Sequence, residues 1–509
     1  MGKKADALFK NLALGIALFL MNMASVFAQT QASFKWSAYQ SVGKYSQAVF
    51  LFNDSNTKGM LVKYNSKLSN RVSKYSLFVY DSLLQFKFKT NFTLLRFKES
   101  ILDIWYFRND IYLLTQASLP NQRVALRLRQ LKTDSMQQEV NFTDLVVLNK
   151  DHYSSLTAFY SSRNDTGLIV WYGNSQTRRH ENKNLSILTY DYGMNLKDKS
   201  LVDLPVQSEL CKIVKIEPLA DAKFLIYTKQ YFVRAIEKRG FSPNFNYVFY
   251  LANPSIEAMS AVVLPHKNTF MDRFRLKMKN GILEATGFYA HQFEGPKIGF
   301  RVFRYDFNLA STRLDTMHAF DKNISSLKTN RVKSSFFRKS KLESFYLDYF
   351  IKINDTDRLV VAEQFMVLPA SIGSSYTYNR FYGDILLLYF NTKGEILSAK
   401  RLLKAQETYN NFGEFSSYYI ERDDLNFSFF YNSKSNRDSN TRTKPLIWHK
   451  QSSLIVSKVN AGSIQMHCAA TYASVDGIIQ VRDMLKLSKQ NYLVYAYKHK
   501  KGKLGLMTY

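Results

Sequence analysis

Several residue types are scarce in this chain, and each scarcity excludes a class of protein. Only 2 of the 509 residues are cysteine, so the fold is not a disulfide scaffold, and there is no CxxC pair to suggest a redox centre. The 8 histidines are scattered, without the HxH or HExxH spacing of a zinc site. P-loop, GxGxxG and GxSxG motifs are absent, which removes the usual anchors of nucleotide chemistry and acyl transfer. The sequence therefore predicts no metal, no cofactor and no catalytic residue.

The two cysteines leave one question open. Cys211 and Cys468 each lie in an apolar run typical of a strand, far apart in the sequence. In an oxidising compartment they could form a disulfide. The alternative, which we favour, is that both are small buried hydrophobic residues, because free cysteine is among the most buried residue types.

Acidic residues are also few relative to basic ones. The chain has 41 Asp and Glu against 70 Lys and Arg, a formal net charge of +29. Such a charge attracts anionic partners and keeps a protein soluble. This net charge exceeds what solubility requires, which favours a surface that binds anionic partners. The alternative is a basic surface that only contacts solvent.

The N-terminal residues have the pattern of a segment that is removed by cleavage. Lys3, Lys4 and Lys10 precede an apolar run over 12–27, and Val26-Phe27-Ala28 is a small-residue cleavage site. We expect residues 1–28 to be a signal peptide, since this run is short for a membrane span, which is the alternative. Cleavage would remove three Lys and one Asp and leave a net charge of about +27. The mature chain, residues 29–509, has no later apolar run of spanning length, so we expect no transmembrane span. The signal peptide predicts an exported protein of the periplasm, the outer membrane or the cell exterior. We therefore expect no nucleic-acid partner.

What the chain has in abundance is aromatic and β-branched sequence arranged in hairpins. It contains 33 Tyr and 39 Phe, residue types that favour half-buried pleated surfaces. Ser186–Pro205 shows the pattern: an apolar strand, a polar turn with Asp191, Gly193 and Asn195, and a second strand. The pattern recurs at intervals of 52 to 85 residues. The other six copies lie at 75–89, 124–140, 246–263, 299–317, 384–403 and 453–470.

Between these hairpins lies a second pair of strands, joined by Asn/Asp/Gly turns such as those at 108–110 and 354–357. Four antiparallel strands repeated about every 60 residues are typical of propeller blades. The last unit has only three strands, at 477–483, 491–498 and 503–509, and residues 33–39 could supply the fourth. The sequence thus predicts one all-β domain, a β-propeller of eight four-stranded blades closed by its N- and C-terminal strands. Seven blades would result if the weak unit at 124–140 were misread.

Three polar stretches interrupt the repeat, and loops carry function on rigid scaffolds more often than strands do. The largest is a basic insertion over 321–341; shorter ones lie at 176–183 and 432–444. Residues 230–240 could be a helix or a loop. Interfaces favour arginine and aromatic residues, so we expect the insertion to supply the contact residues. The predicted contacts are Arg331, Lys333, Phe336, Phe337, Arg338 and Lys339.

Two kinds of chemistry were weighed against this binding role. Oxygen-rich turns at 53–56 and 354–357 suggest calcium, but they lack the glycine and distal glutamate of a calcium loop and are explained by turn geometry. Glycoside cleavage needs two carboxylates facing one sugar, and several in the later units lie near strand ends. These are Glu294, Glu343, Glu363, Asp384 and Glu414.

The segment Gly383–Asn432, with GDILLLYFNTKGEILSAKRLLKAQ followed by SSYYIERDDLNFSFFYNSKSN, resembles the late blades of secreted β-propeller proteins of Gram-negative bacteria. The ending YLVYAYKHKKGKLGLMTY is similar to their closing strands. The resemblance implies a propeller in the cell envelope and no catalytic residue, although the excess of Lys and Arg departs from the group. We therefore expect a non-catalytic binding or scaffolding subunit of the bacterial envelope that engages a protein complex or an anionic polysaccharide through basic loops. The alternative is a propeller glycosidase or polysaccharide lyase with carboxylates at the central channel.

Overall fold

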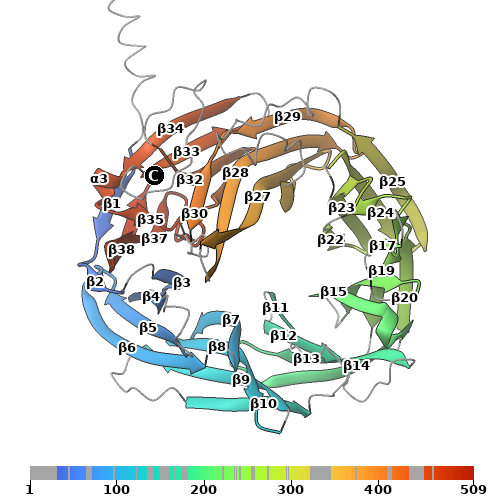
Figure 1. Ribbon diagram of the computed structural model, residues 1–509, viewed down its shortest axis with the longest axis horizontal. Helices are drawn as coiled ribbons and strands as arrows, with labels where there is room; N and C mark the ends of the chain where they lie inside the picture. Colours follow the sequence, from blue (N-terminus) through green and yellow to red (C-terminus); the bar gives the residue numbers. More distant parts are fainter. Residues whose placement is uncertain are drawn as a thin grey trace, which may run out of the picture.

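The chain folds into a ring of eight β-sheets, seen end-on in Figure 1. This computed structural model describes residues 31–43, 46–54, 56–64, 72–95, 98–121, 123–133, 141–149, 160–164, 167–173, 181–219, 223–233, 236, 238–239, 242–253, 258–271, 274–293, 295, 297–320, 345–372, 375–409, 415–434, 452–460 and 463–509. Each sheet is one blade, and all its strand pairs are antiparallel. The predicted eight-bladed β-propeller is confirmed.

The blades follow one another in chain order, and each runs from an inner strand at the central channel to an outer strand at the rim. Blade 1 consists of β3 (Gln47–Asn53), β4 (Thr57–Tyr64), β5 (Val72–Asp81) and β6 (Phe86–Leu95). Blade 2 consists of β7 (Glu99–Phe107), β8 (Asp110–Leu119), β9 (Arg123–Lys132) and β10 (Asn141–Asn149). Blade 3 consists of β11 (Tyr160–Asn164), β12 (Gly167–Gly173), β13 (Asn182–Tyr190) and β14 (Leu196–Gln207). Blade 4 consists of β15 (Cys211–Pro218), β16 (Phe224–Tyr231), β19 (Phe245–Asn253) and β20 (Ala258–Leu264).

The later blades carry additional short strands. Blade 5 has β21 (Phe270–Met271) and β22 (Arg275–Lys279) at the inner position, then β23 (Ile282–Ala290), β24 (Gly299–Asp306) and β25 (Ser311–Ala319). Blade 6 consists of β26 (Phe345–Lys352), β27 (Asp357–Ile372), β28 (Ser375–Asn391) and β29 (Ile396–Leu402), and β30 (Gln406–Tyr409) also pairs with β28. Blade 7 consists of β31 (Tyr419–Asp423), β32 (Asn426–Lys434), β33 (Ser452–Val459) and β34 (Ile464–Thr471). The helical elements are the short η1 (Ser208–Leu210) and α3 (Tyr472–Val475) within the residues described.

Blade 8 joins the two ends of the chain, as the sequence predicted. Its inner position holds β35 (Ile478–Ile479) and β36 (Leu485–Lys486), followed by β37 (Asn491–Lys498) and β38 (Lys501–Thr508). The rim strand is β1 (Ser33–Trp36), which pairs with β38 from Ser33↔Thr508 to Trp36↔Gly505, and β2 (Gln40–Ser41) continues that pairing. The N-terminal strand therefore completes the last blade and closes the ring.

One face of the ring carries tight turns stabilised by Asp and Asn side chains. Asp81 accepts hydrogen bonds from the N–H groups two and four residues later, at 2.9 and 2.8 Å. Asp191 accepts from the N–H of Asn195 at 2.9 Å and from its side-chain amide at 3.0 Å. Leu84 and Met194, one residue before the end of each turn, both have positive φ (66° and 63°). Asp191 and Asn195 are therefore turn residues, as the sequence predicted.

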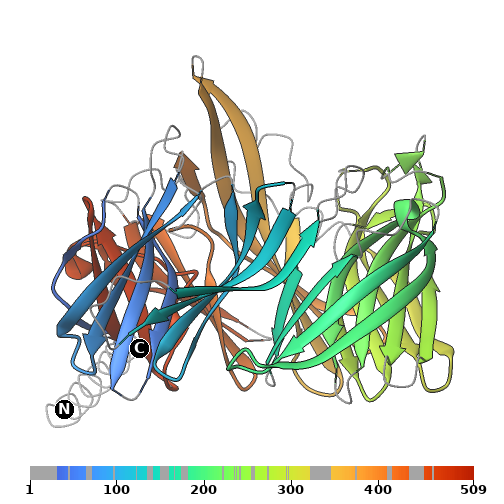
Figure 2. The ribbon, with the colours of Figure 1, turned by 90° about the horizontal axis from the view of Figure 1, so that it is seen from below.

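The opposite face carries the longer features. Strand direction alternates within a blade, so the second-to-third strand connections all emerge on this face. In blade 6 this hairpin is far longer than its counterparts: β27 and β28 have 16 and 17 residues and stay paired out to Ile372↔Ser375. Figure 2 shows this arm projecting beyond the rest of the ring. In blade 4 the same connection holds the short pair β17 (Lys238–Arg239) and β18 (Ser242–Pro243), and none of its described residues is helical.

The hydrophobic core lies between neighbouring blades and repeats around the ring. Each cluster combines residues of two adjacent sheets; at the closure, Val62 and Phe78 of blade 1 pack with Leu493 and Tyr495 of blade 8, all fully buried. Burial of this kind contributes about 1.5–3 kcal/mol for each large apolar side chain. Because every blade is packed on both sides, the backbone around the channel is held rigidly.

Candidate functional site

The predicted contact residues of the basic insertion cannot be placed in the ring. Arg331, Lys333, Phe336, Phe337, Arg338 and Lys339 lie outside the described residues, as do Glu294, Glu343 and Glu414. The candidate site is therefore built from the residues that the structure does describe, beginning with the two remaining carboxylates, Glu363 and Asp384.

Glu363 and Asp384 lie on the neighbouring strands β27 and β28, and both point toward Lys404. Glu363 forms an ion pair with the Lys404 ammonium and accepts a hydrogen bond from Ser417 Oγ at 2.7 Å. Asp384 accepts from the Lys404 backbone N–H at 2.7 Å and forms an ion pair with Arg401. Glu363 and Asp384 were considered in the sequence as carboxylates that could face a sugar, but both are held by protein groups here.

Burial keeps Glu363 and Asp384 away from any substrate. Glu363 is 6% exposed, Asp384 2% and Lys404 1%. Lys404 also donates to Gln406 Oε1 at 3.0 Å, and its ammonium lies near the faces of two tyrosine rings. Burial lowers the pKa of Lys404, while the neighbouring Glu363 carboxylate raises it. A substrate could not reach these carboxylates, so the group is a closed structural network at the root of the arm.

Asp348, on the inner strand β26, is a carboxylate less enclosed than Glu363 and Asp384, since it is only partly buried. The register of β26 shifts between Leu347 and Tyr349, so Asp348 sits at a β-bulge, a feature that often redirects a side chain near a functional site. Tyr418 donates its hydroxyl hydrogen to Asp348 Oδ2 at 2.8 Å. Burial, and then repulsion from Glu363, raises the pKa of Asp348 to about 6, although the Tyr418 hydrogen bond opposes this shift. A carboxyl group with such a pKa can both take up and release a proton near neutral pH.

Two arginines and a tyrosine accompany it at the channel wall. Arg275 on β22 reaches across to blade 6 and donates from Nε to the Leu347 carbonyl oxygen at 3.1 Å. Arg482, between β35 and β36, makes no hydrogen bond or ion pair with any described residue. Tyr349 is 41% exposed, and the charges of both arginines lower the pKa of its hydroxyl, against a larger rise caused by burial and by Asp348.

We call Arg275, Asp348, Tyr349, Tyr418 and Arg482 the channel cluster. Its members come from blades 5, 6, 7 and 8, so only the closed ring brings them together. The cluster combines guanidinium groups available to an anion, a half-exposed aromatic ring and a carboxyl group that titrates near pH 6. Titratable groups with perturbed pKa values cluster at functional positions. An Asp within an aromatic inner strand was the signal in the sequence that could have indicated it.

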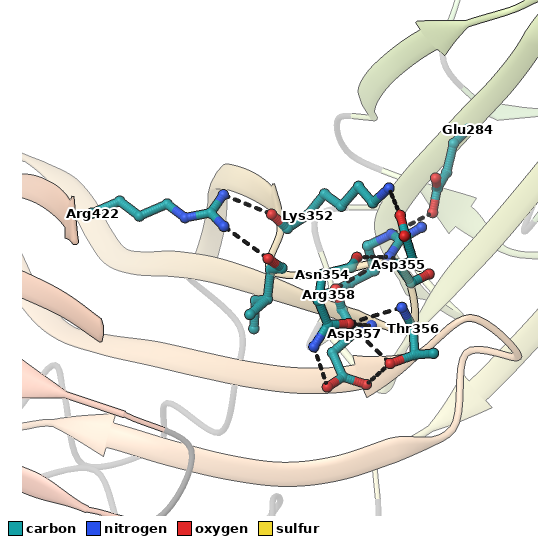
Figure 3. Close-up of polar contacts among 9 residues, drawn as sticks. Glu284, Lys352, Asn354, Asp355, Thr356, Asp357, Arg358 and Arg422 are labelled. Carbon is teal, nitrogen blue, oxygen red and sulfur yellow. Dashed lines mark hydrogen bonds and ion pairs between the residues drawn. The ribbon is translucent and has the colours of Figure 1, made fainter. Parts of the chain in front are cut away.

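The oxygen atoms of the calcium-like turn at 354–357 accept hydrogen bonds from protein groups, as Figure 3 shows. Asn354 Oδ1 accepts from the Thr356 N–H at 2.8 Å and from the Asp357 N–H at 2.7 Å. Arg358 Nη1 donates to the carbonyl oxygens of Asn354 and Asp355 at 3.0 and 3.3 Å. The turn interpretation is therefore sufficient, and the oxygens that a calcium ion would need already have donors. Among the described residues, no group of three His, Cys, Asp or Glu side chains could hold a metal ion.

Both cysteines have free thiols. Cys211 is buried in blade 4, where burial raises its pKa to about 12, and Cys468 lies in blade 7. No helix within the described ranges is long and apolar enough to cross a membrane.

Comparison of the sequence with known protein families and with curated proteins finds no match. Comparison of the structure finds propeller-type folds. The WD40 domain of SCAP from fission yeast is 12% identical over 94% of this chain and 98% of that chain, with a TM-score of 0.37. A polysaccharide lyase is 8% identical over the same shares, with a TM-score of 0.35. An endo-arabinase from Bacteroides thetaiotaomicron is 7% identical over 59% of this chain and 91% of that chain, with a TM-score of 0.26. These likenesses concern the fold alone.

Proposed function

We propose that this protein is an exported envelope subunit that binds an anionic polysaccharide at its central channel. The observation that carries the proposal is that Arg275 of blade 5 donates to the inner strand of blade 6, beside the half-exposed Tyr349, and that Arg482 of blade 8 is close enough to act electrostatically on that tyrosine. A guanidinium group binds a carboxylate through paired hydrogen bonds, and an aromatic ring stacks on the apolar face of a sugar. A uronic acid offers both features on one ring.

The charge of the whole protein supports the same ligand class. A net charge of +29 raises the local concentration of polyanions around the ring, and a channel lined by cations focuses that attraction. Tyr346, 38% exposed on the same inner strand as Tyr349, adds a second aromatic surface. The contribution of residues 331–339 to this binding stays a prediction from the sequence, as does the export signal at 1–28.

The test is a binding titration with a polyuronate, using neutral dextran as the uncharged control. We expect Arg275→Gln and Arg482→Gln each to weaken polyuronate binding about tenfold, on the scale of one charge-assisted contact. Arg123→Gln provides the matched control, because Arg123 is exposed on β9 in blade 2, away from the channel cluster. Equal affinity for dextran, or unchanged affinity in both channel variants, would contradict the proposal.

A second candidate, cleavage of the bound polysaccharide, is favoured by one observation. Asp348 has a pKa of about 6 and lies next to the Tyr418 hydroxyl, so it could act as a general acid or base. Incubation with polyuronates, followed by assays for reducing ends and for unsaturated products, tests it. Product formation that Asp348→Asn abolishes while binding persists would establish cleavage. No product from the unmodified protein would leave binding as the function.

A further inference from the structure

A second surface feature lies where the ring closes, away from the arm. A depression of about 540 Å³ opens between blade 8 and blade 1 on the tight-turn face. One side is formed by strands β1 and β38 and by the turn after β36. The other side is formed by the turn of the β3–β4 hairpin, at the end of β3 and the beginning of β4. Its lining residues are Ser33, Phe34, Lys35, Asn53, Lys58, Leu487, Ser488, Asn491, Leu506 and Thr508.

Lys58 is the unusual member of this lining. Its side chain is only 8% exposed, yet it makes no hydrogen bond or ion pair with any residue that the structure describes. A largely buried charge is normally paired, because removing an ammonium group from water without a partner costs several kcal/mol. Lys58 lines the depression, so the depression is the place from which an anion could reach the ammonium group.

The rest of the lining suits an anion attached to a sugar. Lys35 adds a second positive charge, and no Asp or Glu is among the described residues that line the depression. One rim is a fixed polar chain: Thr508 Oγ1 donates to Asn491 Oδ1 at 2.8 Å, and Asn491 Nδ2 donates to Ser488 Oγ at 2.8 Å. Leu487 and Leu506, which also pack against the core between blades 8 and 1, add an apolar surface.

We propose that this depression binds a small sugar anion, whose carboxylate or phosphate group pairs with Lys58 and Lys35. The polar rim would hydrogen-bond the sugar hydroxyl groups, and the apolar residues would contact the ring. The volume is within the range of sites for small organic ligands. The site is independent of the channel cluster, since it lies between blades 8 and 1 and shares no residue with that cluster.

Calorimetric titration with glucuronate, glucose 6-phosphate, inorganic phosphate and neutral glucose tests the proposal. We expect saturable binding of at least one sugar anion, weaker binding of inorganic phosphate, and none of glucose. Lys58→Met should reduce the affinity at least tenfold, because it removes the charge and keeps the length of the side chain. Lys87→Met is the matched control, since Lys87 is an exposed lysine on β6 of the same blade and does not line the depression.

A second variant keeps the test decisive if Lys58→Met folds poorly. Ser33 is exposed on the rim strand β1, so Ser33→Trp should fill the depression without disturbing the core and should also abolish binding. Arg275→Gln should leave this binding unchanged, which separates the two sites. The proposal fails if no sugar anion binds at millimolar concentration, if inorganic phosphate binds as tightly as the sugar anions, or if neither variant at the depression changes the affinity.

Discussion

Tyr418, just before the inner strand of blade 7, donates its hydroxyl hydrogen to Asp348 Oδ2 of blade 6 at 2.8 Å. This contact joins two blades at the channel and holds a carboxyl group whose pKa is raised to about 6. Because the carboxyl group of Asp348 has its ordinary pKa in the unfolded chain, the rise caused by burial has a consequence for stability that can be measured.

Asp348 should make the fold less stable as the pH rises. Between pH 4 and 6 the folded protein binds more protons than the unfolded chain, so stability is present in full below pH 4 and declines as the pH passes through 6. We expect Asp348→Asn to raise the free energy of unfolding by about 2–3 kcal/mol at pH 8 and to have little effect at pH 4. Urea denaturation at both pH values measures this difference, and an equal effect at both would contradict the assignment.

Lys404 should be essential to the base of the arm. Lys404→Met leaves the buried Glu363 carboxylate with the Ser417 hydroxyl and no cation, at an expected cost of about 3–5 kcal/mol. The double variant Lys404→Met/Glu363→Gln should recover most of this loss. Lys486→Met breaks the more exposed pair with Glu421 and should cost less than about 1 kcal/mol. Urea denaturation midpoints of the unmodified protein and the three variants measure these losses. An equal loss of stability in Lys404→Met and Lys486→Met would contradict the special role of Lys404.

The turn at 354–357 should depend on arginine and not on calcium. Arg422 of blade 7 donates to the carbonyl oxygens of Lys352 and Ile353, both at 2.8 Å. We expect Arg422→Ala to lower the free energy of unfolding by about 1 kcal/mol. A calcium chelator should leave the melting temperature unchanged in both proteins. A drop in melting temperature on chelation would show that the turn holds an ion.

Ring closure should be sensitive to a single methyl group. A Cβ atom at Gly505 would lie 2.3 Å from the Trp36 ring, whereas at Gly193 the nearest atom would be 3.3 Å away. Gly505→Ala should therefore destabilise the protein by about 2 kcal/mol and Gly193→Ala by less. Adding Trp36→Leu to Gly505→Ala should restore part of the loss. Thermal unfolding of the three variants provides the measurement, and a neutral Gly505→Ala would disprove this packing.

The repeat could be predicted from the sequence because it depends on local features. Alternating apolar residues specify each strand, and an Asp or Asn such as Asp191 specifies the turn through hydrogen bonds within a few residues. The predicted hairpin at 124–140 proved to be β9 and β10, with the second strand starting only at Asn141, so the weak unit is a true blade.

The site could not be predicted because it depends on packing between blades. Glu363 looked accessible in the sequence, but Lys404, which follows the outer strand of the same blade, pairs with it and excludes water. Asp348 was overlooked because the β-bulge at its position in β26 and its contact with Tyr418 of blade 7 arise only in the folded ring. The arm was missed for a related reason: Pro369 and the small residues that follow it are typical of a loop, yet the ladder between β27 and β28 continues through them.

The closure of blade 8 also sets the order in which this protein can be completed. Ser37 Oγ accepts a hydrogen bond from the Leu504 N–H, a contact between residues 467 positions apart. During synthesis β1 emerges long before its partner β38, so the ring stays open until β38 has been made. A chain that stops early would lack β38 and would expose the unpaired edges of β1 and β37, which are sites of aggregation. The eight residues of β38 thus decide whether the ring can close.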